Sequence, residues 1–296
     1  MKNMIIKRRY KLLADFDKVS QFLDDNYDLE TLNSYLLRPF FEYAHTHPHF
    51  NHQSTPRFGL WEEEGKLVGL ACYEMDLGEC FLSVKDGYDH LLPDMLEYAE
   101  SELSTTSEEK RILSVWITDK EEVKSQLLGE KGYEKVYTEP VTIFSYDKDF
   151  VEVELPKGYS LFSLEEENDI QKIHACLWKG FDHGPDPDDD HEGRLYMQSG
   201  PNFRKDLTMI IKAPNGDYAC YAGMWFDEQN KYAYTEPLAT VPEHRGKGLA
   251  TIALTEAMKK TKELGAKYCF GGVPDFYKSI GFETICFREK WEKVLE

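Results

Sequence analysis

The segment that most constrains the fold is a short basic turn between a strand pattern and a helix pattern. Residues 232–241 are typical of a strand, and residues 246–264 place apolar side chains on one helical face. The turn, Arg245-Gly-Lys-Gly248, contains two glycines, and their lack of a Cβ atom lets backbone N–H groups approach an anion. A helix N-terminus also presents unsatisfied N–H donors and favours negative charge. The segment therefore predicts a phosphate-binding strand–turn–helix unit.

The composition makes this basic turn a local exception. The chain has 35 Lys and Arg against 54 Asp and Glu, a formal net charge of −19. Such a charge repels nucleic-acid phosphates and anionic membranes and favours cationic partners, although an acidic surface can also serve solubility alone. We therefore expect no nucleic-acid partner, no membrane partner and a cationic substrate.

Targeting and redox features indicate the cytoplasm. The beginning of the sequence has no apolar stretch long enough for a signal peptide, and no run approaches the ~20 apolar residues of a membrane helix. The six cysteines lie far apart, and none forms a CxxC pair. They are typical of reduced core residues rather than of a disulfide framework or a zinc site.

The spacing of the turn separates it from the commonest nucleotide-binding loops. Neither GxxxxGK[ST] nor GxGxxG is present. The pattern Arg245-x-x-Gly248-x-Ala250 resembles the pyrophosphate-binding motif of the GNAT family of N-acetyltransferases. Two further segments are in register with that family: Leu238-Ala-Thr240 before the turn, and Phe276-Tyr-Lys-Ser-Ile-Gly-Phe282 after the helix. The resemblance covers residues 158–292.

The resemblance implies an α/β fold, a mixed twisted sheet flanked by helices, with acetyl-CoA as co-substrate and no metal. The strand before the turn would splay from its neighbour and pair with the pantetheine arm through Leu238, Ala239 and Thr240. The pyrophosphate would lie against the turn and the first helical residues, namely Arg245, Gly246, Lys247, Gly248, Leu249 and Ala250. The acceptor would be an amine of a small molecule or a peptide, and the sequence leaves the oligomeric state open.

Two side chains are candidates for catalysis. Glu236 precedes the pantetheine-binding residues and would take the proton of the attacking amine, anchor a cationic substrate, or serve as a structural hydrogen-bond acceptor. Tyr277 occupies the family's tyrosine position and would give a proton to the leaving thiolate; otherwise it is a packed aromatic. A backbone N–H near Leu238 would polarise the thioester carbonyl.

The first half of the chain repeats this order of elements. A charged seam at residues 147–158 separates it from the second half. Before the seam, strand patterns at residues 58–61 and 67–74 precede a helix at 91–103 and a strand at 112–117. The sequence therefore predicts two tandem acyl-CoA N-acyltransferase-like domains, residues 1–150 and residues 151–296.

The predicted N-terminal domain departs from the motif. Aligning residues 87–92 with residues 245–250 places His90 opposite Gly248 and Leu92 opposite Ala250, and it turns Asp89 toward the phosphates. Leu128 stands opposite Tyr277. We expect this domain to be degenerate and to bind no cofactor. Two alternatives to an acetyltransferase remain, a non-catalytic acyl-CoA-binding module and a tandem-fold aminoacyl transferase, and the acidic charge argues against the second.

Two other clusters invite a functional interpretation. His45, His47, His49 and His52 can be a metal site, but no Cys or carboxylate with ligand spacing accompanies them, which favours a loop near the substrate. Residues 182–192 form an acidic segment that either recognises an amine or is merely solvated. Trp225 and Tyr234 either line the pocket or belong to the core.

Overall fold

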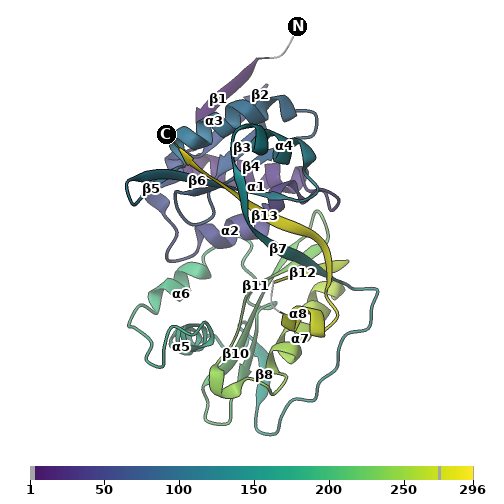
Figure 1. The fold of residues 1–296 in the computed structure, drawn as a ribbon. Helices are drawn as coiled ribbons and strands as arrows, with labels where there is room; N and C mark the ends of the chain where they lie inside the picture. The colour runs from purple at the N-terminus through teal and green to yellow at the C-terminus, as the bar shows by residue number, and fades with distance from the viewer. Residues whose placement is uncertain (1–3, 273–274, 296) are drawn as a thin grey trace. The chain divides into compact units, whose positions relative to one another are not determined.

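The structure, a computed structural model, describes residues 4–272 and 275–295 (Figure 1). It divides into two compact units. The N-terminal unit contains the described residues up to 45, together with residues 49–141 and 285–295. The C-terminal unit contains residues 46–48 and the described residues of 142–284.

The N-terminal unit is built on a mixed sheet with the strand order β1-β2-β3-β4-β6-β13-β7, and the short strand β5 pairs with β6. The strands are β1 (Ile5–Arg9), β2 (Gly59–Glu63), β3 (Lys66–Cys72), β4 (Glu79–Val84), β5 (Thr105–Ser107), β6 (Lys110–Thr118), β7 (Glu134–Ser145) and β13 (Glu283–Leu295). The helices are α1 (Leu12–Asp25), α2 (Arg38–His45), α3 (Leu92–Glu102) and α4 (Glu122–Glu130). Short 3-10 turns occur at Leu32–Tyr35, His52–Arg57 and Asp89–Leu91.

The strands of the C-terminal unit continue the same mixed sheet, in the order β7-β12-β11-β10-β9-β8. Its strands are β8 (Ser160–Ser163), β9 (Met209–Lys212), β10 (Tyr218–Asp227), β11 (Tyr232–Thr240) and β12 (Tyr268–Gly271), with the end of β7. Its helices are α5 (Ile170–Gly180), α6 (Glu192–Met197), α7 (Leu249–Glu263) and α8 (Asp275–Ser279). A 3-10 turn at Pro242–His244 links β11 to α7.

The two halves of the sequence repeat one order of elements. Each runs strand, two helices, three strands, helix, strand, helix, strand, with β5 as an addition in the first half. In each half the third strand of the central trio pairs in parallel with the strand that follows the long helix, β4 with β6 and β11 with β12. The predicted α/β fold of two tandem domains is therefore confirmed.

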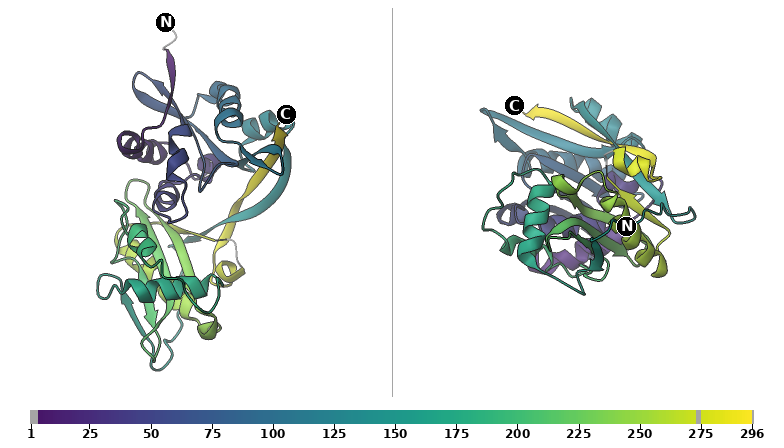
Figure 2. Two further views of the ribbon diagram at one scale, coloured as in Figure 1. Left: turned by 90° about the vertical axis from the view of Figure 1, so that its left-hand side faces the viewer. Right: turned by 90° about the horizontal axis from the view of Figure 1, so that it is seen from below.

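Long strands near the unit boundaries belong partly to each unit. Residues 288–295 of β13 pair antiparallel with β6 in the N-terminal unit, although they follow the C-terminal unit in sequence. Conversely, residues 142–145 of β7 pair with β12 in the C-terminal unit. Figure 2 shows β13, in yellow, running beside β7, in teal. The domain limits at residue 150 remain a prediction about the repeated halves, because the compact units are not continuous in sequence.

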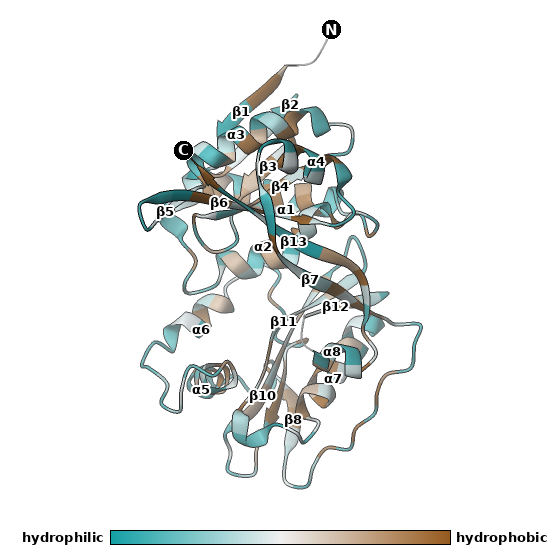
Figure 3. Ribbon diagram, in the orientation of Figure 1, coloured by the Kyte–Doolittle hydropathy of each residue, from teal (hydrophilic) through white to brown (hydrophobic). Residues whose placement is uncertain are grey.

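The core of the C-terminal unit explains why its central elements form. Helix α7 buries Leu249, Ala253 and Ala257 at helical spacing, and small residues of β10 such as Ala219 and Ala222 let the helix approach closely. Helix α5 also packs on β10 and β11, and Figure 1 shows α5 and α7 on opposite sides of these strands. Figure 3 shows hydrophobic residues along β10 and on part of α7.

Candidate active site

The site begins where β11 separates from β12. The parallel pairing of these strands ends at Tyr234 and Phe270, and Leu238, Ala239 and Thr240 pair with no strand on that side among the described residues. On its other side β11 stays paired with β10, except at a register shift around Gly223. A Cβ atom on Gly223 would lie 2.4 Å from the carbonyl oxygen of Glu236, so glycine is needed for this bulge. The backbone of Leu238 to Thr240 therefore borders an open gap.

The turn after β11 exposes the N-terminal end of α7. Gly246 has φ 76° and Gly248 has φ 75°, left-handed values that glycine adopts without strain. Within the described residues, no backbone carbonyl accepts a hydrogen bond from the N–H groups of residues 246–251. Gly248 also lies against Val153, which a Cβ atom would approach to 2.7 Å. The turn therefore leaves several backbone N–H groups without an intrahelical partner at the N-terminus of α7, a helix of fifteen residues.

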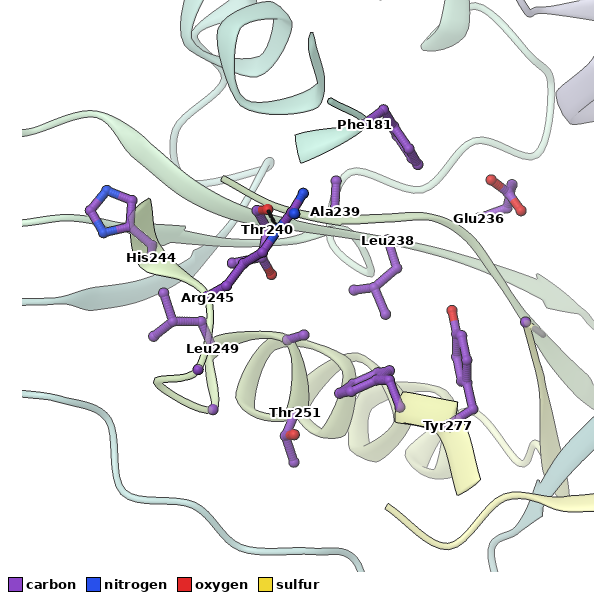
Figure 4. A pocket seen from close by; sticks show the side chains of 15 residues that line it. Phe181, Glu236, Leu238, Ala239, Thr240, His244, Arg245, Leu249, Thr251 and Tyr277 are labelled. Carbon is purple, nitrogen blue, oxygen red and sulfur yellow. Dashed lines mark hydrogen bonds between the residues drawn. The ribbon is translucent and has the colours of Figure 1, made fainter. Parts of the chain in front are cut away.

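The gap and the turn form one pocket of about 650 Å³ within the C-terminal unit. Ten of the eleven predicted site residues line it: Glu236, Leu238, Ala239, Thr240, Arg245, Gly246, Gly248, Leu249, Ala250 and Tyr277. The exception is Lys247, whose side chain instead donates to the carbonyl of Glu243 at 2.8 Å. Figure 4 shows β11 on one side of this pocket and α7 with α8 on the other.

The ring of Tyr277 packs against the backbone of Gly271, which has no side chain to block it. The Tyr277 side chain is only 6% exposed, and a Cβ atom on Gly271 would lie 2.5 Å from its ring. Phe282 packs edge-on against the same ring at 5.1 Å. Figure 4 shows the phenol of Tyr277 extending from α8 toward the part of β11 that carries Leu238 and Glu236. The hydroxyl is thus the polar end of a fixed, otherwise buried aromatic.

Arg245 lines the pocket and links three neighbouring segments. Its Nε donates to the carbonyl of Thr240 at 3.1 Å, and its Nη2 donates to the carbonyl of Gly180 at 2.9 Å. The same Nη2 forms an ion pair with Asp182, 3.0 Å from Oδ1. Arg245 therefore connects the end of α5 to the end of β11 at the edge of the pocket.

Five lining residues were not predicted: Phe181, His244, Thr251, Gly272 and Phe276. His244, Thr251 and Phe276 are direct neighbours of predicted residues, so the motif itself could have included them. His244 accepts or donates a hydrogen bond with Tyr159, 2.8 Å from the phenolic oxygen. Phe181 lies far from the motif in sequence, and only the packing of α5 on β11 brings it there.

The histidine cluster has a structural explanation at His45. This residue ends α2 rather than lying in a loop, and its ring packs at a tilt against Phe41 and Phe50, with Nδ1 2.9 Å from the carbonyl of Phe41. Burial lowers the pKa of His45 to about 4. The described residues contain no group of three or more His, Cys, Asp or Glu side chains that could hold a metal ion.

The aromatic residues of the central strands belong to the core. Trp225 and Tyr234 are buried and do not line the pocket. The indole N–H of Trp225 donates to the carbonyl of Glu236 at 3.0 Å and so supports the strand beside the bulge. In the acidic segment, the backbone carbonyl of Asp188 lies 3.0 Å from Nε2 of the buried His174.

Comparison with known proteins identifies the pocket-bearing region. A model of the acetyltransferase (GNAT) family matches residues 168–282, which include every residue that lines the pocket. Residues 168–282 form a GNAT-family domain. No curated protein matched the chain.

Solved structures extend the similarity to the whole chain. A GCN5-related N-acetyltransferase from Sphaerobacter thermophilus has a TM-score of 0.60 at 15% identity, covering 98% of this chain and 95% of that one. A tandem GNAT protein from the clavulanic acid biosynthesis pathway has a TM-score of 0.60 at 14% identity, covering 98% of both chains. The N-myristoyltransferase of Saccharomyces cerevisiae reaches 0.56 at 11% identity, covering 99% and 80%. These likenesses show a shared tandem GNAT fold.

The GNAT domain supports a general chemistry, acyl transfer from an acyl-CoA to an amine-bearing acceptor. The structural neighbours differ in the acyl group named for them, acetyl in some and myristoyl in another, so the family alone does not choose the acyl chain. In the described part of the chain, every helix is too short or too polar to cross a lipid bilayer.

Proposed function

We propose that this protein is an N-acetyltransferase that moves an acetyl group from acetyl-CoA to an amine of a small molecule or a peptide. One observation carries the proposal: a single pocket joins the unpaired edge of β11, the open N-terminus of α7 and the hydroxyl end of Tyr277. An acyl-CoA needs these three parts: a groove for its pantetheine arm, N–H groups that bind its diphosphate, and a proton for its sulfur when the thiolate leaves.

The residues present fit an acyl-CoA. The unpaired N–H groups of residues 246–251 offer hydrogen bonds to a diphosphate, and the left-handed glycines leave that approach open. The backbone edge of Leu238, Ala239 and Thr240 would pair with the amides of pantetheine, and the carbonyl of Thr240 would first release Nε of Arg245. Arg245 lies beside the same pocket and supplies positive charge, whereas Lys247 would act at longer range. When bound, the co-substrate supplies an activated acetyl thioester.

The catalytic roles follow from the two polar side chains. An amine attacks only with a free lone pair, so its proton must leave; Glu236, whose carboxylate lines the pocket, would take or relay it. If the amine arrives neutral, Glu236 would instead hold a cationic part of the substrate. Tyr277 would hold a proton at its phenolic oxygen for the departing thiolate, and its packing would keep that oxygen in place. A backbone N–H near Leu238 would polarise the thioester carbonyl.

The proposal includes the wider setting of the enzyme. The acceptor would be cationic, in keeping with the net charge of −19, and the protein would act in the cytoplasm without nucleic acid or a metal. The N-terminal half would bind no cofactor. An acyl-CoA-binding module without catalysis would have the same pocket but would release no thiol.

The test is a thiol-release assay with acetyl-CoA over a panel of amines: polyamines, aminoglycosides, amino acids and peptides with free N-termini. We expect thiol release with at least one class, and a matching acetylated product by mass spectrometry. A parallel series with propionyl-, octanoyl- and myristoyl-CoA tests the acyl chain. Calorimetric binding of coenzyme A with no turnover would favour the binding module, and folded protein without affinity for coenzyme A would overturn the proposal.

A further inference from the structure

The ion pair between Arg245 and Asp182 occupies the guanidinium that the proposed function directs at a diphosphate. Arginine binds phosphate most strongly through two parallel N–H groups on one edge of its guanidinium. Each of the two forked edges includes Nη2, which here serves Asp182 at 3.0 Å and Gly180 at 2.9 Å. Nε also serves Thr240. Neither forked edge of Arg245 is therefore free for a phosphate in the structure.

Asp182 is placed to compete for Arg245, although its side chain is 65% exposed. It follows the C-terminal cap of α5, and its backbone N–H donates to the carbonyl of Lys179 at 3.0 Å. Its φ is 59°, a left-handed value that Asp and Asn tolerate better than most residues. The preceding residue, Phe181, lines the pocket. The carboxylate thus stands at the pocket edge, at the beginning of the acidic segment 182–192.

We infer that Asp182 competes with the diphosphate of coenzyme A for Arg245, an inference that rests on the proposed function. Two anions cannot both share one forked edge, and the Asp182 carboxylate repels a bound diphosphate. Binding therefore requires Arg245 to exchange Asp182 for phosphate. That exchange releases the first residue of the acidic segment from the pocket edge. Because such linkage is reciprocal, any ligand that holds Asp182 away from Arg245 also raises affinity for coenzyme A.

The test is a double-mutant cycle measured by calorimetry with coenzyme A alone. Asp182→Asn removes the charge and keeps a residue suited to positive φ. Asp186→Asn is the matched control, because it removes the same charge from an exposed position of the same segment. We expect Asp182→Asn to tighten binding about three- to tenfold, the range of an exposed ion pair plus the relieved repulsion, and Asp186→Asn to change it less than twofold. In an Arg245→Ala background only the smaller gain that comes from the relieved repulsion should remain.

A second readout follows the acidic segment itself. Hydrogen exchange at residues 182–192 should increase when coenzyme A binds the wild-type protein and should change less in Asp182→Asn. Equal affinities for the wild type, Asp182→Asn and Asp186→Asn would overturn the inference while leaving the proposed function intact. A gain of the same size without Arg245 would also overturn it. Failure of every folded variant to bind coenzyme A would overturn both.

Discussion

The pocket of the C-terminal unit has a counterpart in the N-terminal unit, formed by equivalent elements with the opposite charge. That second pocket, about 560 Å³, is lined by the end of α1, the end of β4, the turn after it and the start of α4. Strands β4 and β6 also separate early, after Phe81 and Trp116. Six acidic side chains line it, Asp25, Asp28, Asp86, Asp89, Glu121 and Glu122, against two lysines. The first pocket has one carboxylate, Glu236, and one arginine, Arg245.

The two lysines, Lys120 and Lys124, offset only part of the acidic charge. Lys124 is only 5% exposed, and its ammonium group is bound by Glu121 and by the hydroxyl of Ser34 at 2.8 Å. Glu121 in turn accepts from the backbone N–H of Thr118 at 2.7 Å. The comparison teaches that equivalent elements of the two halves can line pockets of opposite charge, because the side chains at the helix ends and in the turn after the central strand differ.

The largest effect should come from giving the C-terminal turn an acidic side chain like that of its counterpart. Gly246→Asp adds a carboxylate where a Cβ atom has nothing within 4 Å and where Asp tolerates the left-handed backbone, so the fold should persist. Repulsion of the diphosphate should weaken coenzyme A binding about 100-fold. Gly246→Asn is the isosteric control and should lose far less. Calorimetry should also give one site per wild-type chain; two sites, or equal losses for Asp and Asn, would break the comparison.

A smaller effect is expected from removing the hydroxyl for which the N-terminal unit has no counterpart. Tyr277→Phe keeps the buried ring against Phe282 but removes the proton donor. With the amine identified by the screen, kcat should fall about 10- to 100-fold while the affinity for coenzyme A stays unchanged. Tyr196→Phe, at an exposed position of α6, should leave kcat unaltered. Unchanged turnover in Tyr277→Phe would remove the acid role.

The units should also differ in their response to acid, because His45 belongs to the N-terminal core. Its pKa is lowered to about 4 from 6.5 by burial, so the unfolded chain binds more protons between these values. This contribution to stability is therefore lost as the pH falls through that window, by about 2 kcal/mol between pH 7 and pH 5. Chemical denaturation of the wild type and His45→Gln at both pH values isolates it. Equal pH dependence of the two proteins would contradict the buried neutral imidazole.

The local parts of the site could be predicted from the sequence. The turn at residues 245–248 combines backbone freedom, helix start and charge in a few neighbouring positions, and the structure gathers ten of the predicted residues around one pocket. The limits of α7 and β11 agree with the expected helix and strand to within a few residues. Such features depend on neighbouring residues, which a sequence displays directly.

What was missed depends on contacts distant in sequence. The strand β4 was overlooked because Glu79–Val84 is short and its burial comes from β3 and β6. Helix α6, with only six residues, has too little length for a periodic pattern. Phe181 reaches the pocket only through the packing of α5. The polar residues around His45 did not indicate that its ring packs against Phe41 and Phe50. The sequence also does not show which strands β7 and β13 pair with, since each strand could pair within its own half of the chain.

The placement of β13 has a consequence for biosynthesis. Residues 288–295 complete the sheet beside β6, yet a ribosome adds them only after it has made the whole C-terminal unit. The N-terminal unit must therefore wait, with the side of β6 that later receives β13 still unpaired, until translation has passed its neighbour. The N-terminal unit, although synthesised first, is therefore the unit whose sheet is completed last.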